Sequence, residues 1–253
     1  MDTLKGKNSP PPAALKIGAV IPAAGMGVRM GSRNPKQFLD LCGRPMLVVT
    51  LETFQNCPHI DGIILVVPVD KVDACRENIV QPYRLTKVTQ VVAGGEKRQD
   101  SVKLGIEASE GIYERIMIHD GVRPLVPGSL IDRVAAEGRH HRAVIPALPS
   151  KETVKSVDDD GFVLKTHDRN RIWHVQTPQL FLYVDILAAH QQAVREGWET
   201  VTDDAFLLEK TGIPVKVIEG SEENIKITTP GDLELARLIL NRSDAPPTGA
   251  QVT

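Results

Sequence analysis

Short apolar segments alternate with longer amphipathic ones along most of this 253-residue chain, and this alternation limits the fold more than any other feature. The apolar segments lack a polar face, as strands do when both sides of a parallel sheet are covered. Strands are therefore expected at 16–22, 62–68, 88–94, 115–120 and 143–148. Helices are expected between them, at 46–57, 70–81, 98–109 and 129–138. The pattern predicts an α/β fold with a doubly wound, mostly parallel sheet, whose ligands bind beyond the carboxyl ends of the strands.

The alternation is interrupted at residues 150–171. Polarity alternates around Thr153, Lys155 and Val157, and an Asp-Gly turn separates this run from a second one, "FVLKT". This pattern is typical of a β-hairpin. It offers few apolar residues for burial, and an isolated two-stranded hairpin is only marginally stable in water. We therefore expect a projecting β-hairpin arm that packs on a second subunit.

After the hairpin the chain returns to α/β structure. Further elements are expected at 201–212 (helix), 214–220 (strand) and 228–240 (helix). Thr202 and Thr229 precede the two helices and are expected to be their N-caps, because a Thr hydroxyl can accept a bond from a free backbone N–H of the first turn. Ser129 has an acid three residues later, which predicts a capping box for the helix at 129–138.

The length of the chain accommodates one sizeable α/β domain, expected over 16–242, with disordered polar tails at 1–15 and 243–253. A formal net charge of −2 gives no basic field for nucleic acid, and we expect no such partner. No apolar run approaches the roughly 20 residues of a membrane span, and no signal peptide is recognisable. The three cysteines form no CxxC pair, which favours reduced thiols in a cytoplasmic protein over a disulfide framework or a zinc site.

A glycine-rich segment, "IPAAGMGVRMGSRNPKQF", follows the first expected strand. A dinucleotide fingerprint would need its third glycine one residue before Gly31, and no acid ends the next strand to hold a ribose. A P-loop would need Gly-Lys-Ser/Thr, which does not occur here. Backbone N–H groups around Gly25 and Gly27 could still line an anion, with Arg29 and Lys36 neutralising phosphate oxygens. From the residues alone, a glycine-rich turn with solvent-facing cations remains the alternative.

Eight motifs together carry a family resemblance. They are, in chain order, "PAAGMGVRM", "PKQF", "GGEKRQDS", "HDGVRP", "DRNRIW", "QTPQ", "TDDA" and "NIKIT". With them the chain resembles the 2-C-methyl-D-erythritol 4-phosphate cytidylyltransferases over about residues 17–240. The resemblance implies a Rossmann-like nucleotidyltransferase fold and transfer of CMP from CTP to methylerythritol phosphate, with release of pyrophosphate, in non-mevalonate isoprenoid biosynthesis. It also implies Mg²⁺ held mainly by the CTP phosphates rather than by a protein metal site, and a homodimer formed through the arm.

The resemblance also assigns roles to individual residues. Those matching the catalytic set are Arg29, Lys36, Asp120 and Lys226. Those matching CTP contacts are Pro22, Ala23, Ala24, Gly25, Gly27, Gly95, Glu96, Arg98 and Ser101. Those matching contacts to the sugar phosphate are Asp120, Thr153, Arg169, Thr177 and Thr202, of which Thr153 and Arg169 would reach the neighbouring subunit's site. The family more often has Asp or a small polar residue at Glu96, and Ala-Ala where Gly121 and Val122 stand.

Several of these residues also have plainer interpretations. Lys226 alone could be a surface lysine at a strand end, Ser101 a first-turn serine and Asp120 a turn residue. His119 is expected to pack or to orient a neighbour rather than to bind metal. Two other functions stay open: a ribitol 5-phosphate cytidylyltransferase, which would share the fold and CTP, and an inactive nucleotide-binding regulator. The catalytic set argues against a regulator, which would not need all four charged residues.

Overall fold

The computed structural model describes residues 15–25, 35–198 and 201–243. Most of the two expected tails, 1–14 and 244–253, lies outside these residues, as does the segment 26–34 with Gly27 and Arg29. No helix among the described residues is long and apolar enough to cross a membrane.

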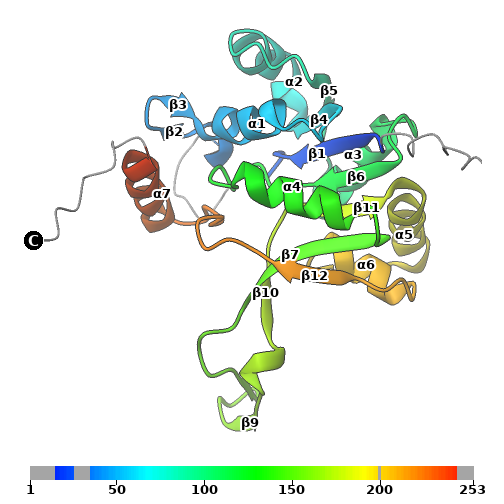
Figure 1. The fold of residues 1–253 in the computed structure, drawn as a ribbon, viewed down its shortest axis with the longest axis vertical. Coiled ribbons are helices and arrows are strands. Elements are labelled where there is room, and N and C mark those ends of the chain that lie inside the picture. Colours follow the sequence, from blue (N-terminus) through cyan, green and yellow to red (C-terminus); the bar gives the residue numbers. More distant parts are fainter. Residues whose placement is uncertain (1–14, 26–34, 199–200, 244–253) are drawn as a thin grey trace, which may run out of the picture.

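An eight-stranded sheet forms the centre of the molecule, in the order β10-β7-β11-β6-β1-β4-β5, with β12 beside β7 (Figure 1). Its strands are β1 (Ile17–Pro22), β4 (Gly62–Val67), β5 (Val88–Ala93), β6 (Arg115–Ile118), β7 (Ala143–Pro149), β10 (Trp173–Val175), β11 (Gln179–Leu182) and β12 (Lys216–Glu219). The adjacent strands β6, β1, β4 and β5 run parallel to one another, and β12 runs parallel to β7. β10 runs antiparallel to β7, and β11 runs antiparallel to both β6 and β7. The expected mostly parallel sheet is confirmed.

Helices cover both faces of the sheet. One apolar cluster includes Ile21 of β1 and packs α1 (Met46–Asn56) and α4 (Gly128–Glu137). The other includes Val20 of β1 and packs α3 (Arg98–Ala108), α5 (Tyr183–Glu196) and α6 (Asp204–Lys210). Neighbouring residues of β1 thus enter opposite clusters, as alternation along a strand requires, and the doubly wound arrangement is confirmed. A smaller cluster joins α7 (Pro230–Ser243) to the hairpin of β2 (Asp40–Leu41) and β3 (Arg44–Pro45).

Some local expectations were wrong. β5 was expected to be buried on both faces, but it lies at the sheet edge and most of its residues are partly exposed. The single helix expected over 70–81 is a 3-10 turn (Val69–Lys71), a short α2 (Val72–Cys75) and a π-turn (Arg76–Val80). These forms differ by a fraction of a residue per turn, which an apolar pattern does not distinguish.

The helix caps give a mixed result. Thr229 caps α7 as expected, with Asp232 N donating to Thr229 Oγ1 at 3.2 Å. The cap is also reciprocal, because Thr229 N donates to Asp232 Oδ2 at 2.8 Å. Ser129 is not an N-cap, because α4 already begins at Gly128, after a proline with no side-chain cap. Thr202 is not the N-cap of α6 either: Asp203 is, and its carboxylate accepts a bond from Phe206 N at 3.1 Å.

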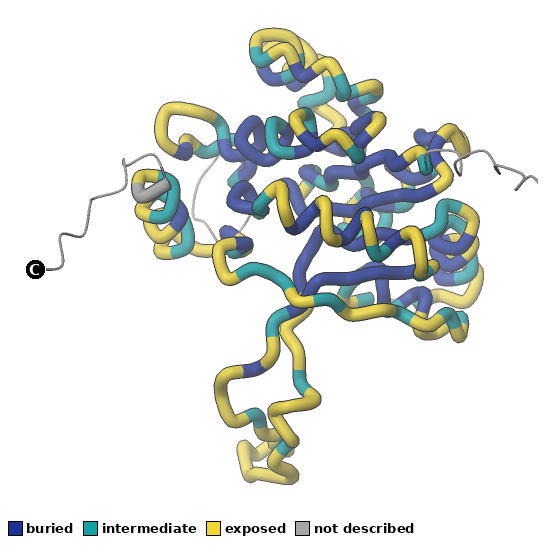
Figure 2. The backbone as a smooth tube through the Cα atoms, viewed as in Figure 1, coloured by how far each residue is buried: buried dark blue, intermediate teal, exposed yellow. Residues whose placement is uncertain are grey.

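The arm projects from the sheet between the end of β7 and the start of β10 (Figure 1). It contains β8 (Lys155–Val157) and β9 (Val163–Thr166), an antiparallel pair joined by a turn in which Gly161 has a φ of +87°. A φ of that sign favours glycine, as the Asp-Gly pair predicted. Most of the arm is exposed (Figure 2). Its apolar residues are included, because Phe162 is 71% exposed and Leu164 67%. The projecting hairpin is confirmed.

Candidate active site

Two adjacent cavities open at the carboxyl ends of β1, β5 and β6. The first, of about 390 Å³, is lined by Pro22, Ala23, Ala24, Gly25, Lys36, Gln37, Gly95, Glu96, Lys97, Arg98, Ser101, Asp120, Val122, Lys226 and Thr228. The second is lined by Arg98, Asp120, Arg123, Val175, Gln176, Thr177, Gln179, Thr202, Asp203, Phe206, Glu209 and Lys226. Arg98, Asp120 and Lys226 belong to both, so these three charged residues form the boundary between the cavities.

The loop after β1 forms one wall of the first cavity. Ala23 N donates to Val66 O at 2.7 Å, and Gln37, which is buried, donates its side-chain amide to Ala23 O. The opposite wall approaches closely at Gly94, where a Cβ would lie only 2.4 Å from Ala24 Cβ and 2.7 Å from Ser101 Oγ. A residue with a side chain would therefore push the two walls apart, so glycine is required there.

Ser101 holds the segment after β5 that forms that opposite wall. Gly95 N donates to its hydroxyl oxygen at 3.2 Å, and the hydroxyl in turn faces Lys97 O at 3.2 Å. The side chain is buried. Its plainer interpretation as a first-turn serine is thus correct for its place in α3, but the hydroxyl also shapes the cavity wall.

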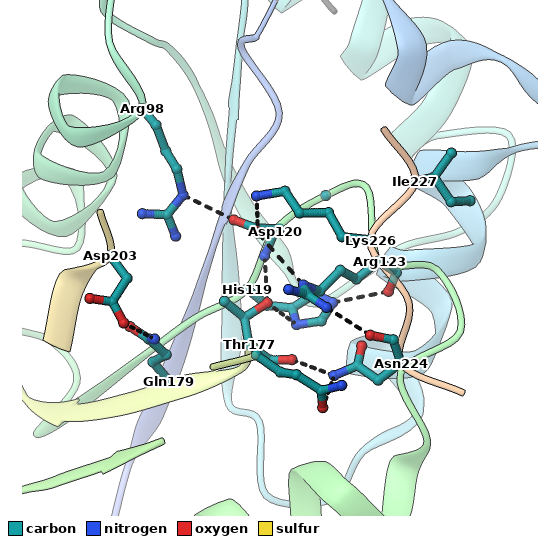
Figure 3. Close-up of polar contacts among 12 residues, drawn as sticks. Arg98, His119, Asp120, Arg123, Thr177, Gln179, Asp203, Asn224, Lys226 and Ile227 are labelled. Atoms are coloured by element: carbon teal, nitrogen blue, oxygen red, sulfur yellow. Dashed lines mark hydrogen bonds and ion pairs between the residues drawn. The ribbon is translucent and has the colours of Figure 1, made fainter. Parts of the chain in front are cut away.

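Asp120 lies at the boundary and faces three cations (Figure 3). Its Oδ1 accepts from Arg98 Nε at 3.0 Å, and its Oδ2 lies 2.9 Å from Lys226 Nζ and 3.7 Å from Arg123 Nε. Burial alone would raise the pKa of Asp120, but these three charges outweigh burial and hold it well below its usual range. Asp120 is therefore an anion that balances a strongly cationic site.

His119 organises the backbone beside Asp120. One ring nitrogen, Nε2, lies 3.1 Å from the carbonyl oxygen of Arg123 and must donate to it, because a carbonyl only accepts. Nδ1 therefore accepts from the Thr177 hydroxyl at 3.0 Å, and the same hydroxyl accepts from Asp120 N at 3.1 Å (Figure 3). The ring is fully buried, and its centroid lies 4.9 Å from the centroid of the Phe54 ring. Burial lowers the pKa of His119 to about 4. Its geometry is that of an orienting residue.

The segment containing Lys226 is fastened to the same loop. Arg123 Nη1 donates to Asn224 O at 2.7 Å, and Asn224 Nδ2 donates to Thr177 O at 2.7 Å (Figure 3). Lys36 Nζ donates to Ile227 O at 3.1 Å. These bonds bring Lys36 and Lys226, distant in sequence, to one wall of the first cavity.

Most of the residues that the sequence singled out converge on these cavities. Those lining the first are Pro22, Ala23, Ala24, Gly25, Lys36, Gly95, Glu96, Arg98, Ser101, Asp120 and Lys226. Thr177 and Thr202 line the second. Thr153 and Arg169 lie on the arm and line neither. Gly27 and Arg29 lie outside the described residues.

Other residues at the site were missed by sequence reasoning. Gln37 lies in the motif "PKQF" and Arg123 in "HDGVRP". These motifs indicated that both residues are near the site but did not predict their contacts. Asn224 opens "NIKIT" in the same way. Phe206 and Glu209 line the second cavity from α6 and carried no local signal.

Comparisons with known proteins agree with this geometry. The family model described as "IspD: 2-C-methyl-D-erythritol 4-phosphate cytidylyltransferase" matches residues 17–242. The chain belongs to the IspD family. It is therefore a nucleotidyltransferase of isoprenoid biosynthesis, as the sequence motifs predicted.

Relatives of known name support the same IspD assignment. A 2-C-methyl-D-erythritol 4-phosphate cytidylyltransferase of Syntrophus aciditrophicus is 47% identical, over 90% of this chain and 97% of its own length. One from Geobacter metallireducens is 44% identical, over 89% and 98%. The crystal structure of 4-diphosphocytidyl-2C-methyl-D-erythritol synthase from Anaerococcus prevotii superposes with a TM-score of 0.80 at 35% identity, covering 90% of this chain and 97% of that one.

Among the described residues of this IspD chain, no group of three or more His, Cys, Asp or Glu side chains is placed to hold a metal ion. The acidic side chains at the first cavity are those of Asp120 and Glu96. Either could at most complement oxygen donors that a ligand brings with it.

Proposed function

We propose that residues 16–242 form a single catalytic domain that transfers the cytidylyl group of CTP to 2-C-methyl-D-erythritol 4-phosphate. The observation that carries the proposal is the pair of cavities joined at one charged boundary. CTP occupies the first cavity and the sugar phosphate the second. The reacting phosphates then meet at Arg98, Asp120 and Lys226.

The reaction needs positioning and charge neutralisation more than a nucleophilic side chain. An oxygen of the substrate phosphate bonds to the α-phosphorus of CTP, and the bond from that phosphorus to the bridging oxygen of the β-phosphate breaks. Pyrophosphate leaves with the electron pair. The attacking phosphate is already anionic, so no general base is required.

The loop backbone and the cations of the site together bind and stabilise the phosphates in this proposal. Backbone groups of Ala23–Gly25 line the triphosphate, and Lys36 stabilises the charge on the α-phosphorus and the leaving pyrophosphate. Arg29 shares that task. Lys226, paired with Asp120 at 2.9 Å, exchanges that carboxylate for a phosphate oxygen when substrates bind.

Mg²⁺ fits this arrangement. Hard oxygen donors suit the ion, and it commonly takes one or two carboxylates together with nucleotide phosphates and water. Asp120 would hold it at the boundary, and the ion would neutralise charge on the triphosphate.

The sugar phosphate is recognised in the second cavity and from the arm. Thr202 lines that cavity, and Asp120 accepts from substrate hydroxyls. The exposed apolar residues of the arm favour a homodimer in which Thr153 and Arg169 reach the partner's second cavity, with Arg169 binding the phosphate. We place the protein in the cytoplasm, with no membrane or nucleic-acid partner.

Pyrophosphate release tests the proposal. Purified protein with CTP and Mg²⁺ is incubated with methylerythritol phosphate or with ribitol 5-phosphate in parallel. Release with methylerythritol phosphate alone is expected. Release with ribitol 5-phosphate alone would make the chain a sister cytidylyltransferase, and release with neither would favour a regulator.

A further inference from the structure

Two carboxylates hold the guanidinium of Arg98. Its Nε donates to Asp120 Oδ1 at 3.0 Å, and its Nη1 donates to Asp204 Oδ2 at 2.8 Å. Asp120 lines both cavities, whereas Asp204 lines neither. Asp204 therefore reaches the site only through Arg98.

Asp204 is fully buried, and so is the group behind it. Its second oxygen, Oδ1, lies 3.4 Å from Nε2 of His190 on α5, and both side chains are withdrawn from solvent. A buried carboxylate is costly unless it is paired. A chain of contacts thus runs from His190 in the core, through Asp204 and Arg98, to Asp120 at the boundary of the cavities.

The chain also contains a similar pair that has no contact with the site. Asp185, at the start of α5, is buried and binds Arg142 through both carboxylate oxygens. Neither residue lines the two cavities. The Arg142 side chain is 58% exposed, but the Asp185 carboxylate is buried. Replacing Asp185 therefore shows what loss of a buried, arginine-paired carboxylate does to stability away from the site.

We infer that Asp204 is a positioning residue for the transfer reaction, holding Arg98 so that the carboxylate of Asp120 keeps its place between the two substrates. This inference rests on the proposed function. With Asp204 present, Arg98 is shared between two anions. Without it, Arg98 is drawn wholly to Asp120 and displaces that carboxylate from its place between the two substrates. His190 supports Asp204 from behind.

The test compares Asp204→Asn with Asp185→Asn, two equivalent replacements of buried carboxylates. kcat, the KM for each substrate and thermal unfolding are measured for both. We expect Asp204→Asn to lower kcat about 10- to 100-fold, the scale of a small misplacement of reacting groups, with each KM changed less than about threefold. Asp185→Asn should lower the unfolding temperature and leave kcat within about twofold of wild type. Equal kcat in the two variants would overturn the inference.

A double-mutant cycle shows whether Asp204 acts through Arg98. In an Arg98→Gln background, Asp204→Asn should lower kcat by less than about twofold, because the intermediary is already gone. Independent, multiplying losses would refute the inference. If Asp204→Asn does not fold, His190→Gln replaces it in the same cycle. An unchanged kcat for His190→Gln in the wild-type background would also refute the inference. A wild-type chain inactive with methylerythritol phosphate would refute the proposed function instead, so the two failures are distinguishable.

Discussion

The buried ring of His119 should make the stability of the protein fall steeply between pH 6.5 and 4. Burial, against weaker effects of neighbouring groups, lowers the pKa of His119 from 6.5 to about 4 in the folded state. Between these values the unfolded chain binds a proton that the folded chain does not, so the free energy of unfolding decreases as the pH falls. At about 1.4 kcal/mol per pH unit, the loss amounts to about 2 kcal/mol by pH 5 and about 3 kcal/mol by pH 4.

Urea unfolding of the wild type and of His119→Gln measures this effect at pH 7, 6, 5 and 4. Glutamine keeps an amide donor but does not titrate in this range. The difference between the two curves removes the contribution of Glu209, whose pKa is raised by burial and by Asp203. Asp120 and Asp204 do not interfere, because their pKa values are lowered and the stability they give is lost mainly below the unfolded value of 3.8.

We expect His119→Gln to be less stable than wild type at pH 7 but to lose about 3 kcal/mol less between pH 7 and 4. Curves that run parallel, with a change in their separation below about 0.5 kcal/mol, would refute the assignment of a buried, neutral ring. They would also remove the reason for assigning Nδ1 as an acceptor, because both ring nitrogens of a charged histidine are donors.

Three further perturbations test the site. Lys36→Ala should lower kcat at least about 100-fold, as for one lost charge contact at a transition state; a loss under about threefold would make Lys36 a surface residue. Thr177→Val leaves Asp120 N and His119 Nδ1 unpaired, and should lower the free energy of unfolding by about 2–4 kcal/mol, while Thr177→Ser retains the bonds and should cost less than half as much. Arg169→Ala and Arg29→Ala are each expected to be inactive, and mixing the two chains should restore activity through one intact composite site. Verified heterodimers without activity would show that the arm does not complete the neighbouring site.

The sheet was largely predictable because its strands are buried on both faces. β4 is buried along its whole length and reads as a continuous apolar run. α5 is the opposite case: its buried face consists of Asp185, Ile186, Ala189, His190 and Ala193, with one large apolar residue. The spacing is helical, but small and polar side chains give a weak pattern, and the helix was missed. β10 and β11 were missed because each is only a few residues long.

The site was predictable where its residues follow strands in a motif, and not where it depends on contacts between distant segments. The carboxyl ends of parallel strands share one edge, so the loops after β1, β5 and β6 had to converge. Nothing local connects Arg98 with Asp204, which are 106 residues apart. Two of the partners of Asp120, Arg98 and Lys226, likewise come from other motifs, and only the fold places them within bonding distance.

The motif "TDDA" shows how a contact between distant segments determines which of several suitable residues caps a helix. Thr202, Asp203 and Asp204 can each cap a helix. Asp203 is the cap because Gln179 of β11, itself buried, donates to its Oδ2 at 2.8 Å and leaves Oδ1 for Phe206 N. That choice makes Asp204 the first residue of α6, where its carboxylate meets Arg98 and His190. The bond from Gln179 of the sheet to Asp203 therefore determines the places of two adjacent carboxylates. Asp203 lines the second cavity, and Asp204 supports the charged boundary from behind.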